Sequence, residues 1–266
     1  TFCTIPLARG HSRSDTIQGV LDNVKELANS DVKEIVLTGV NLGDFGKGYH
    51  GGRHKEETFF DLVKALDSQA LIPRFRISSI EPNLLTDEII EYVASSKTFM
   101  PHFHIPLQSG SDTLLKGMRR RYQRALYTER VAKIRSLMPH CCIGVDVIVG
   151  FPGESDALFQ ETFDYLHALD ISYLHVFTYS ERDNTQAIHM TEVVPMQIRK
   201  QRNAILRQLS EKKMNYFTNQ HIGSVRATLF EHAEKSGMME GYTDNYIKIS
   251  QAFDPHKVNQ IVMEKI

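Results

Sequence analysis

The chain has 266 residues, of which 41% are hydrophobic and 24% are charged, and its formal net charge is -1. This length can bury the core of one large α/β domain with a small module beside it. The sequence has no apolar run of about 18 residues and no basic leader, so we expect no membrane span, no signal peptide and a cytoplasmic location.

The chain opens with TFCTIPLARGHSRS, which has the character of a loop between a strand and a helix. We expect that strand to precede Thr1, so that the chain lacks the first strand of its sheet. Strand-like and helix-like segments then alternate, which predicts right-handed βαβ units around a parallel sheet. The expected strands are 34–39, 74–79, 102–106, 142–151 and 173–179, and the expected helices are 15–29, 58–70, 86–96, 124–138 and 155–169.

The last quarter of the chain has a different pattern. Residues 195–219 predict a long helix with a basic face and an apolar face, the latter formed by Ile198, Ile205, Leu209 and Tyr216. Short strands separated by turn-rich sequence follow, at 225–231, 245–250 and 259–266. This pattern is typical of a small β-barrel or OB-like module of about 45 residues.

Polar and glycine-rich sequence follows each expected strand, at the edge where parallel α/β folds bind ligands. These segments contain LTGVN, SSIEP, HIPLQSGSD, MRRRY, DVIVGFPGE and HVFTYSERDNTQA. Any one of them could be an ordinary turn. Together with the opening segment and the later EGYTDNYIKI, they resemble the radical SAM methylthiotransferases. These enzymes insert a methylthio group into a tRNA adenosine or a ribosomal-protein aspartate, and the resemblance covers nearly the whole chain.

The resemblance implies a partial parallel (β/α)6 TIM-like barrel that lacks its first strand, followed by a small all-β barrel. The limits it implies are 1–194 for the radical SAM core, 195–220 for a connecting helix and 221–266 for a TRAM-like, OB-like barrel. In this family the TRAM domain binds the RNA or protein substrate. We therefore expect an iron-sulfur transferase of tRNA modification that is a monomer and has no membrane partner.

The family's cofactors are S-adenosylmethionine (SAM) and a 4Fe-4S cluster, with a second cluster in the full-length enzymes. Cys3 matches the last cysteine of the family's C-x3-C-x2-C motif, whose thiolates bind three irons and leave the fourth iron to SAM. Arg120 matches a position where a guanidinium pairs with the carboxylate of SAM. The remaining matches place Gly39 and Asn41 at the amino group of SAM, Glu81 and Gln108 at its ribose, and Phe177 and Thr178 at its adenine.

The chain departs from the family in its cluster ligands. Cys3 is the one motif cysteine present, and the family's N-terminal domain, with three further cysteines, has no counterpart here. Since one thiolate cannot hold a 4Fe-4S cluster, we expect no complete cluster and no activity in the chain as given. Cys141 and Cys142 begin an apolar strand, where we expect them to fill the core.

An enzyme of another class is one alternative. His102 and His104 lie two residues apart on an expected strand, so they face the same way. Such a pair inside an α/β barrel can bind zinc, as in metal-dependent hydrolases, if other strands supply further ligands. His175 is the candidate for such a ligand, in the middle of its strand.

A module that only binds RNA is a second alternative. The basic face of helix 195–219 and the run Arg119 to Arg121 could contact phosphates. Three aromatic side chains of the last segment could stack on bases or could instead form the core of the barrel: Tyr242, Tyr246 and Phe253.

Within the methylthiotransferases, SSIEP and GYTDNYIKI favour the enzyme that acts on threonylcarbamoyladenosine next to the tRNA anticodon. The enzyme that acts on a ribosomal-protein aspartate is the alternative substrate assignment. No physical property of the sequence separates these two.

Overall fold

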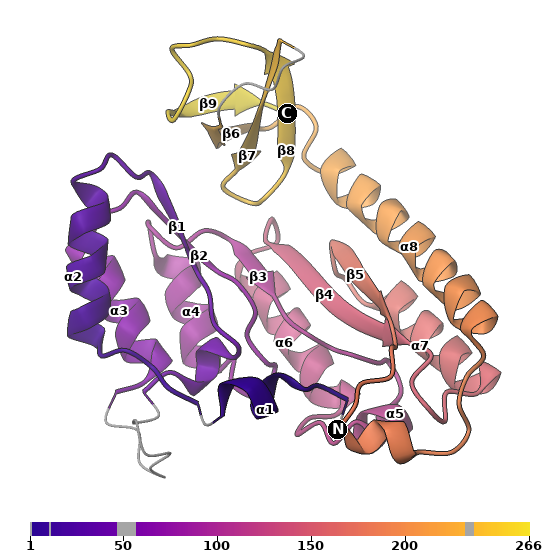
Figure 1. Cartoon of the computed structure of the whole chain (residues 1–266). Coiled ribbons are helices and arrows are strands. Elements are labelled where there is room, and N and C mark those ends of the chain that lie inside the picture. Colours follow the sequence, from indigo (N-terminus) through magenta and orange to yellow (C-terminus); the bar gives the residue numbers. More distant parts are fainter. Residues whose placement is uncertain (1, 11, 47–56, 232–236) are drawn as a thin grey trace.

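The computed structural model describes residues 2–10, 12–46, 57–231 and 237–266. Its larger part is built on an arc of parallel strands, with helices behind them (Figure 1). The strands are β1 (Glu34–Leu37), β2 (Arg74–Ile77), β3 (His102–His104), β4 (Cys142–Val149) and β5 (Tyr173–Thr178).

The strands of the arc pair in chain order. β1 pairs with β2, and β3, β4 and β5 form a second parallel ladder. Isolated parallel bridges join Phe75 to Phe99 and Ser79 to His104, and they connect β2 with β3. The predicted parallel α/β fold is confirmed, and all five predicted strands overlap strands of the structure.

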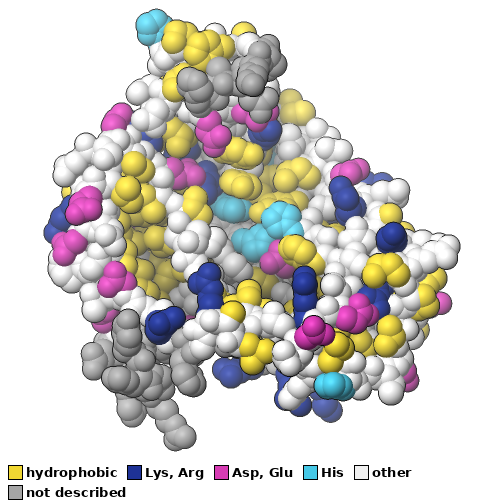
Figure 2. Space-filling view, viewed as in Figure 1, with side chains coloured by type: hydrophobic (Ala, Val, Ile, Leu, Met, Phe, Trp, Pro, Cys, Tyr) yellow, Lys and Arg dark blue, Asp and Glu magenta, His cyan; other side chains and the backbone are white. Residues whose placement is uncertain are grey.

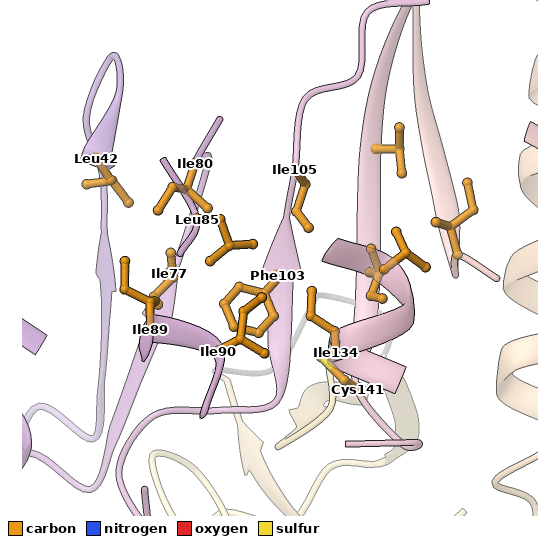
Figure 3. Packing of buried hydrophobic residues seen from close by; sticks show 14 of the residues in the cluster. Leu42, Ile77, Ile80, Leu85, Ile89, Ile90, Phe103, Ile105, Ile134 and Cys141 are labelled. Carbon is orange, nitrogen blue, oxygen red and sulfur yellow. The ribbon is translucent and has the colours of Figure 1, made fainter. Parts of the chain in front are cut away.

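Amphipathic helices cover the outer face of the arc. In α3 the first turn is fixed by a capping box, because Thr58 and Asp61 each bond the backbone N–H of the other. Figure 3 shows how this layer packs, with Ile77 of β2 and Phe103 of β3 against Ile90 and Ile134 of the helices. The helices predicted from apolar periodicity are α2 (Ile17–Ala28), α3 (Phe59–Gln69), α4 (Asp87–Ser95), α6 (Arg124–Leu137) and α7 (Asp156–Ala168).

Four short helices were not predicted. Each has at most six residues, which is too short for an apolar stripe to repeat along the sequence. They are α1 (Ile5–Arg9), α5 (Asp112–Gly117) and the two 3-10 helices η1 (Leu42–Asp44) and η2 (Gln186–His189).

The long helix α8 (Met196–Asn219) forms as predicted, but its buried face was predicted only in part, since Leu209 is buried and Ile198 is half-buried. Ile205 and Tyr216 are 42% and 65% exposed, whereas Arg199 and Arg202 are buried. Arg202 lies 2.7 Å from both Glu154 and Asp156, so its charge is neutralised inside the fold. Two arginines thus occupy buried positions at which periodicity predicts apolar residues, because acidic residues of other elements neutralise their charges. None of the helices among the described residues is long and apolar enough to cross a bilayer.

α8 protects the edge of the parallel sheet. Ser210 Oγ accepts a hydrogen bond from Leu174 N at 2.8 Å and donates one to Leu174 O at 2.9 Å. Asn203 Nδ2 donates to Val176 O at 3.1 Å, also on β5. The helix therefore satisfies backbone groups that an edge strand would otherwise leave for a further strand.

Replacing Ser210 should weaken this contact measurably. We expect Ser210→Ala to lower the free energy of unfolding by about 1–2 kcal/mol, because the buried Leu174 N–H loses its acceptor. Urea titration followed by circular dichroism measures the change. The control is Ser136→Ala, which removes an exposed hydroxyl bonded to Lys133 O and should change stability by less than about 0.5 kcal/mol. Equal effects of the two variants would contradict the prediction.

The C-terminal module is an antiparallel sheet in the order β8, β7, β6, β9. The sequence predicts three of these strands and misses β7, whose MMEGYT segment contains a glycine. Gly241 is required there by close packing, since a Cβ on it would lie 2.7 Å from Leu229 O on the neighbouring strand. The strands are β6 (Val225–Phe230), β7 (Met238–Thr243), β8 (Lys248–Ala252) and β9 (Ile261–Lys265).

The module lies over the amino-terminal ends of the parallel strands, and α1 lies at the other end (Figure 1). Arg74 donates to Tyr242 O and Ala227 O, and Arg76 donates to Asp244 O and Thr243 O. The ring of Tyr246 stacks on His102 of β3 with ring centroids 4.2 Å apart. One end of the arc is thereby closed by the module, which leaves the carboxyl ends of the strands as the place for a ligand.

Candidate functional site at the carboxyl ends of the strands

Two of the predicted site residues form an ion pair beyond the strand ends. Arg120 Nη1 lies 3.0 Å from Glu81 Oε1, and both side chains are less than one third exposed. The guanidinium also lies over the ring of Phe2, 5.2 Å from its centroid. Because Phe2 precedes Cys3 in the chain, this contact brings the cysteine segment to the Arg120–Glu81 pair.

The end of β1 borders a separate part of the same edge. Gly39 and Asn41 line a cavity of about 660 Å³ together with Arg9 and Arg13, which follow Cys3 in the chain. Gly43, in the short helix η1 that follows Asn41, packs so closely on Leu84 that a Cβ would lie 2.3 Å from that side chain. Since Leu84 follows Glu81 by three residues, this packing holds the β1 end beside the β2 end.

The other predicted residues lie on the remaining strands. Gln108 is buried, and its backbone N–H donates to Asp146 O while its carbonyl accepts from Ile148 N. Its φ of 73° is left-handed, which a non-glycine residue adopts at a cost. Phe177 and Thr178 end β5 at the far edge of the arc, where the Phe177 side chain is 52% exposed. The structure thus brings Glu81, Arg120 and the Cys3 segment together, and places Phe177 and Thr178 farthest along the arc from Gly39 and Asn41.

Two of the predicted site residues each have a buried polar atom without a hydrogen-bond partner. These atoms are Nε of Arg120 and Oδ1 of Asn41, a donor and an acceptor. Asn41 is otherwise held by its Nδ2, which donates to Asp44 Oδ2 at 3.1 Å. Buried polar groups in folded proteins are nearly always paired, so an unpaired donor and acceptor suit a ligand that carries both an acid and an amine.

The three cysteines occupy two different environments. Cys3 is exposed, and its Sγ accepts from Ile5 N at 3.4 Å, where α1 begins. Cys141 and Cys142 are fully buried at the start of β4, the end covered by the module. Burial raises the pKa of Cys142 to about 12 and also raises the pKa of Cys141. These two thiols fill the core, as their apolar strand predicts.

Thiol labelling should separate these environments. We expect one thiol, Cys3, to react with dithionitrobenzoate in the native chain at pH 8, and all three to react in guanidinium chloride. A thiol whose pKa is about 12 is ionised in about one molecule in ten thousand at pH 8, and the thiolate is the reactive form. In Cys3→Ala the native protein should not react. Rapid labelling of that variant would show that the Cys141–Cys142 pair is accessible.

The inner face of the arc carries a cluster that differs from the predicted histidine pair. His102 is buried, its Nε2 lies 3.2 Å from the Tyr173 hydroxyl, and burial lowers its pKa well below the ordinary value. His104 Nε2 instead lies 2.8 Å from Asp146 Oδ1, and His175 Nδ1 lies 3.4 Å from the same atom. Burial raises the pKa of Asp146, but hydrogen bonds from both imidazoles outweigh it and hold that pKa at about 2. The alternative zinc pair of His102 and His104 is therefore not formed, because His102 packs under Tyr173 and Tyr246, but the structure brings His104 and the further candidate ligand His175 together.

Asp146, the third member of this cluster, was not predicted from the sequence. The available signal is a single acid inside the apolar run CIGVDVIVGF. A charged residue there has to face an open space or a partner, because it is costly to bury alone.

Several of the basic and aromatic side chains that the sequence offers for RNA binding are buried or already paired in the structure. Of the basic face of α8, Arg199 and Arg202 are buried in ion pairs, and Lys213 donates to the carbonyls of His167 and Leu169. Tyr246 is sandwiched between His102 and Tyr242, so its ring is not free to stack on a base. The cations that stay exposed are Lys200, Arg207 and Lys212 on α8, and Arg119 and Arg121 beside the Arg120–Glu81 pair.

Comparison with known proteins gives a consistent set of relatives. A model of the radical SAM superfamily matches residues 1–166. The threonylcarbamoyladenosine tRNA methylthiotransferase MtaB of Bacillus subtilis is 37% identical over 100% of this chain and 59% of its own length. MtaB of Rickettsia prowazekii is 39% identical over 95% of this chain and 60% of its own length. The tRNA-2-methylthio-N(6)-dimethylallyladenosine synthase of Bacillus subtilis is 33% identical over 100% of this chain and 52% of its own length.

Solved structures share the fold at low sequence identity. Coproporphyrinogen III oxidase (HemN) of Escherichia coli, a radical SAM enzyme, has a TM-score of 0.51 and 11% identity over 77% of this chain and 46% of its own. The radical SAM methyltransferase TsrM of Kitasatospora setae has a TM-score of 0.50 and 15% identity over 61% of this chain and 31% of its own. These two likenesses concern the fold alone. The chain spans between 52% and 60% of the length of the three relatives above.

Proposed function

The chain belongs to the radical SAM superfamily, and we propose from this that it works in a tRNA methylthiotransferase whose substrate is threonylcarbamoyladenosine next to the anticodon. The observation that carries the proposal is the extent of the likeness to the MtaB enzymes, at 37% and 39% identity over 95% or more of the chain. The dimethylallyladenosine enzyme of Bacillus subtilis is less similar, at 33%. This order supports the substrate predicted from SSIEP and GYTDNYIKI.

SAM fits the polar groups at the strand ends. Its carboxylate would bind Arg120, whose Nε is buried without a partner and whose Nη1 is already held by Glu81. Its amino group would donate to Asn41 Oδ1, the unpaired acceptor beside Gly39. Glu81 and Gln108 would accept hydrogen bonds from the ribose hydroxyls, and Phe177 and Thr178 would border the adenine.

The described residues fit the 4Fe-4S cluster in part. Cys3 would give one thiolate to an iron, and its segment already contacts Arg120 through Phe2. Cys141 and Cys142 cannot contribute, since they are buried at the opposite end of β4. When bound, the cluster and SAM would supply the radical chemistry. The chain's own residues would fix the orientation of SAM and exclude water beside the Phe2, Phe151 and Arg120 contacts.

A chimera tests this proposal in the setting of a complete enzyme. This chain would replace the matching segment of the Bacillus subtilis MtaB, and the chimera would be expressed in a strain that lacks that enzyme. We expect mass spectrometry of digested tRNA to find the methylthio derivative of threonylcarbamoyladenosine restored, and Cys3→Ala in the same chimera to abolish it. A soluble chimera that restored no methylthio product would contradict the activity. Restoration of the dimethylallyladenosine product alone would contradict the substrate.

A further inference from the structure

The cluster of His104, Asp146 and His175 is set up by three neighbouring parallel strands. β3, β4 and β5 each contribute one member, and Asp146 and His175 are direct partners in the ladder. His104 is paired with Gly144, two residues before Asp146 and on the same face of β4. Histidine and acidic side chains gather accordingly in the hollow of the face that Figure 2 presents.

The distances within the cluster suit one small cation. Asp146 Oδ1 lies 2.8 Å from His104 Nε2 and 3.4 Å from His175 Nδ1, and one donor atom of each residue lies within 4.8 Å of the others. A zinc ion with ligands at about 2.0–2.1 Å separates tetrahedral donors by about 3.3 Å. Small side-chain rotations would therefore turn this hydrogen-bonded trio into a ligand set.

The surroundings of the cluster are closed on one side and open on the other. The ring of Tyr173 packs against both imidazoles, and it has room only because residue 144 is glycine, where a Cβ would lie 2.3 Å from the ring. On the open side the His175 side chain is 55% exposed. His175 also borders a cavity of about 410 Å³ between β5 and α8, together with Phe177 and Arg207. Two imidazoles and one carboxylate with an open side are typical of sites that keep a coordination position for water or substrate.

We propose that His104, Asp146 and His175 bind a single divalent transition-metal ion, such as Zn²⁺, with an open coordination position toward the hollow of the arc. The proposal does not rest on the proposed function. It also concerns other residues than the iron-sulfur ligand, since the trio lies along the strands and contains no sulfur, whereas Cys3 lies beyond their ends. The donor set favours zinc, cobalt or ferrous iron over magnesium or calcium, which prefer oxygen ligands.

Metal titration of the 266-residue chain tests the proposal. The chain would be stripped with a chelator and titrated with Co²⁺ under argon, and the visible absorption bands would report the binding stoichiometry and geometry. We expect one equivalent of Co²⁺ to bind and Zn²⁺ to displace it. His175→Ala and Asp146→Asn should each weaken binding by about 100-fold. Two control variants should keep it: Cys3→Ala, which removes the exposed thiol, and His256→Ala, which removes an exposed histidine of the module.

The alternatives give different results. Failure of the wild-type chain to bind stoichiometric Co²⁺ or Zn²⁺ would show that the trio is a hydrogen-bonded cluster only, and would overturn the proposal. Loss of binding in Cys3→Ala, with binding kept in His175→Ala, would also overturn it. If both ligand variants fail to fold, X-ray absorption of the zinc-loaded wild type decides, because the proposal requires nitrogen and oxygen neighbours and no sulfur.

Discussion

Arg76→Ala is expected to lower the free energy of unfolding by about 3–5 kcal/mol, the largest single-residue effect that we predict for this chain. Arg76 is 1% exposed, and its Nε lies 2.7 Å from Glu34 Oε1. Its two terminal nitrogens donate to Asp244 O and Thr243 O of the module at 2.9 and 2.7 Å. Removing the guanidinium leaves a mostly buried carboxylate and two carbonyls without this donor, and each of these losses carries a desolvation cost.

Thermal unfolding gives the simplest measurement, with an expected fall in the melting temperature on the order of 10 °C. The exposed Arg121→Ala is the matched control and should change stability by less than about 0.5 kcal/mol. Arg76→Lys should be more stable than Arg76→Ala, because an ammonium keeps a positive charge beside Glu34, which otherwise retains only Arg74 at 3.7 Å. An Arg76→Ala protein as stable as the Arg121→Ala control would mean that the module does not dock on β2 as described.

Arg120→Ala in the MtaB chimera is expected to weaken SAM binding by about 10- to 100-fold, since a hydrogen bond to a charged group contributes about 1.5–3 kcal/mol. Arg120→Lys should recover only part of this loss, because an ammonium keeps the charge but lacks the planar fork that pairs with a carboxylate. The pairing with Glu81 at 3.0 Å fixes the guanidinium in one orientation, so Glu81→Gln should also weaken binding.

Equilibrium dialysis with labelled SAM on the anaerobically reconstituted chimera measures these affinities. Arg121→Ala, one residue away and exposed, is the control and should bind SAM as the unmodified chimera does. Unchanged SAM affinity in Arg120→Ala would remove Arg120 from the binding site. In that case the buried and unpaired Nε of Arg120 would need another explanation.

The parallel fold was predictable because its strands and helices repeat a clear apolar pattern, from EIVLTG at β1 to YLHVFTY at β5. The buried face of α8 was not, because Arg199 and Arg202 are buried only through Glu181, Glu154 and Asp156, whose positions depend on the finished fold. β7 was not predicted because Gly241 is typical of a turn. The reason for a glycine within this strand is its close contact with the neighbouring strand, which the sequence alone does not reveal.

The candidate site likewise contains residues that local motifs predict and residues that depend on the finished fold. Cys3, Glu81 and Arg120 could be selected from local motifs, and the structure brings Glu81, Arg120 and the Cys3 segment into contact. His104 and His175 were candidates from the sequence, but Asp146 and the exclusion of His102 were not predictable, because they depend on the register of three strands. That register puts Asp146 beside His175 and turns the buried His102 toward Tyr173.

For the proposed tRNA substrate, the docking of the module on the amino-terminal ends also sets a length scale. β4 has eight residues between its amino-terminal end, beside the module, and the end nearest the Cys3 segment, and its seven steps of about 3.3 Å span about 23 Å. A molecule that is gripped by the module and reacts at the far strand ends must extend along the whole height of the arc. A folded RNA arm can bridge that span, whereas a free nucleoside can reach only one end of it.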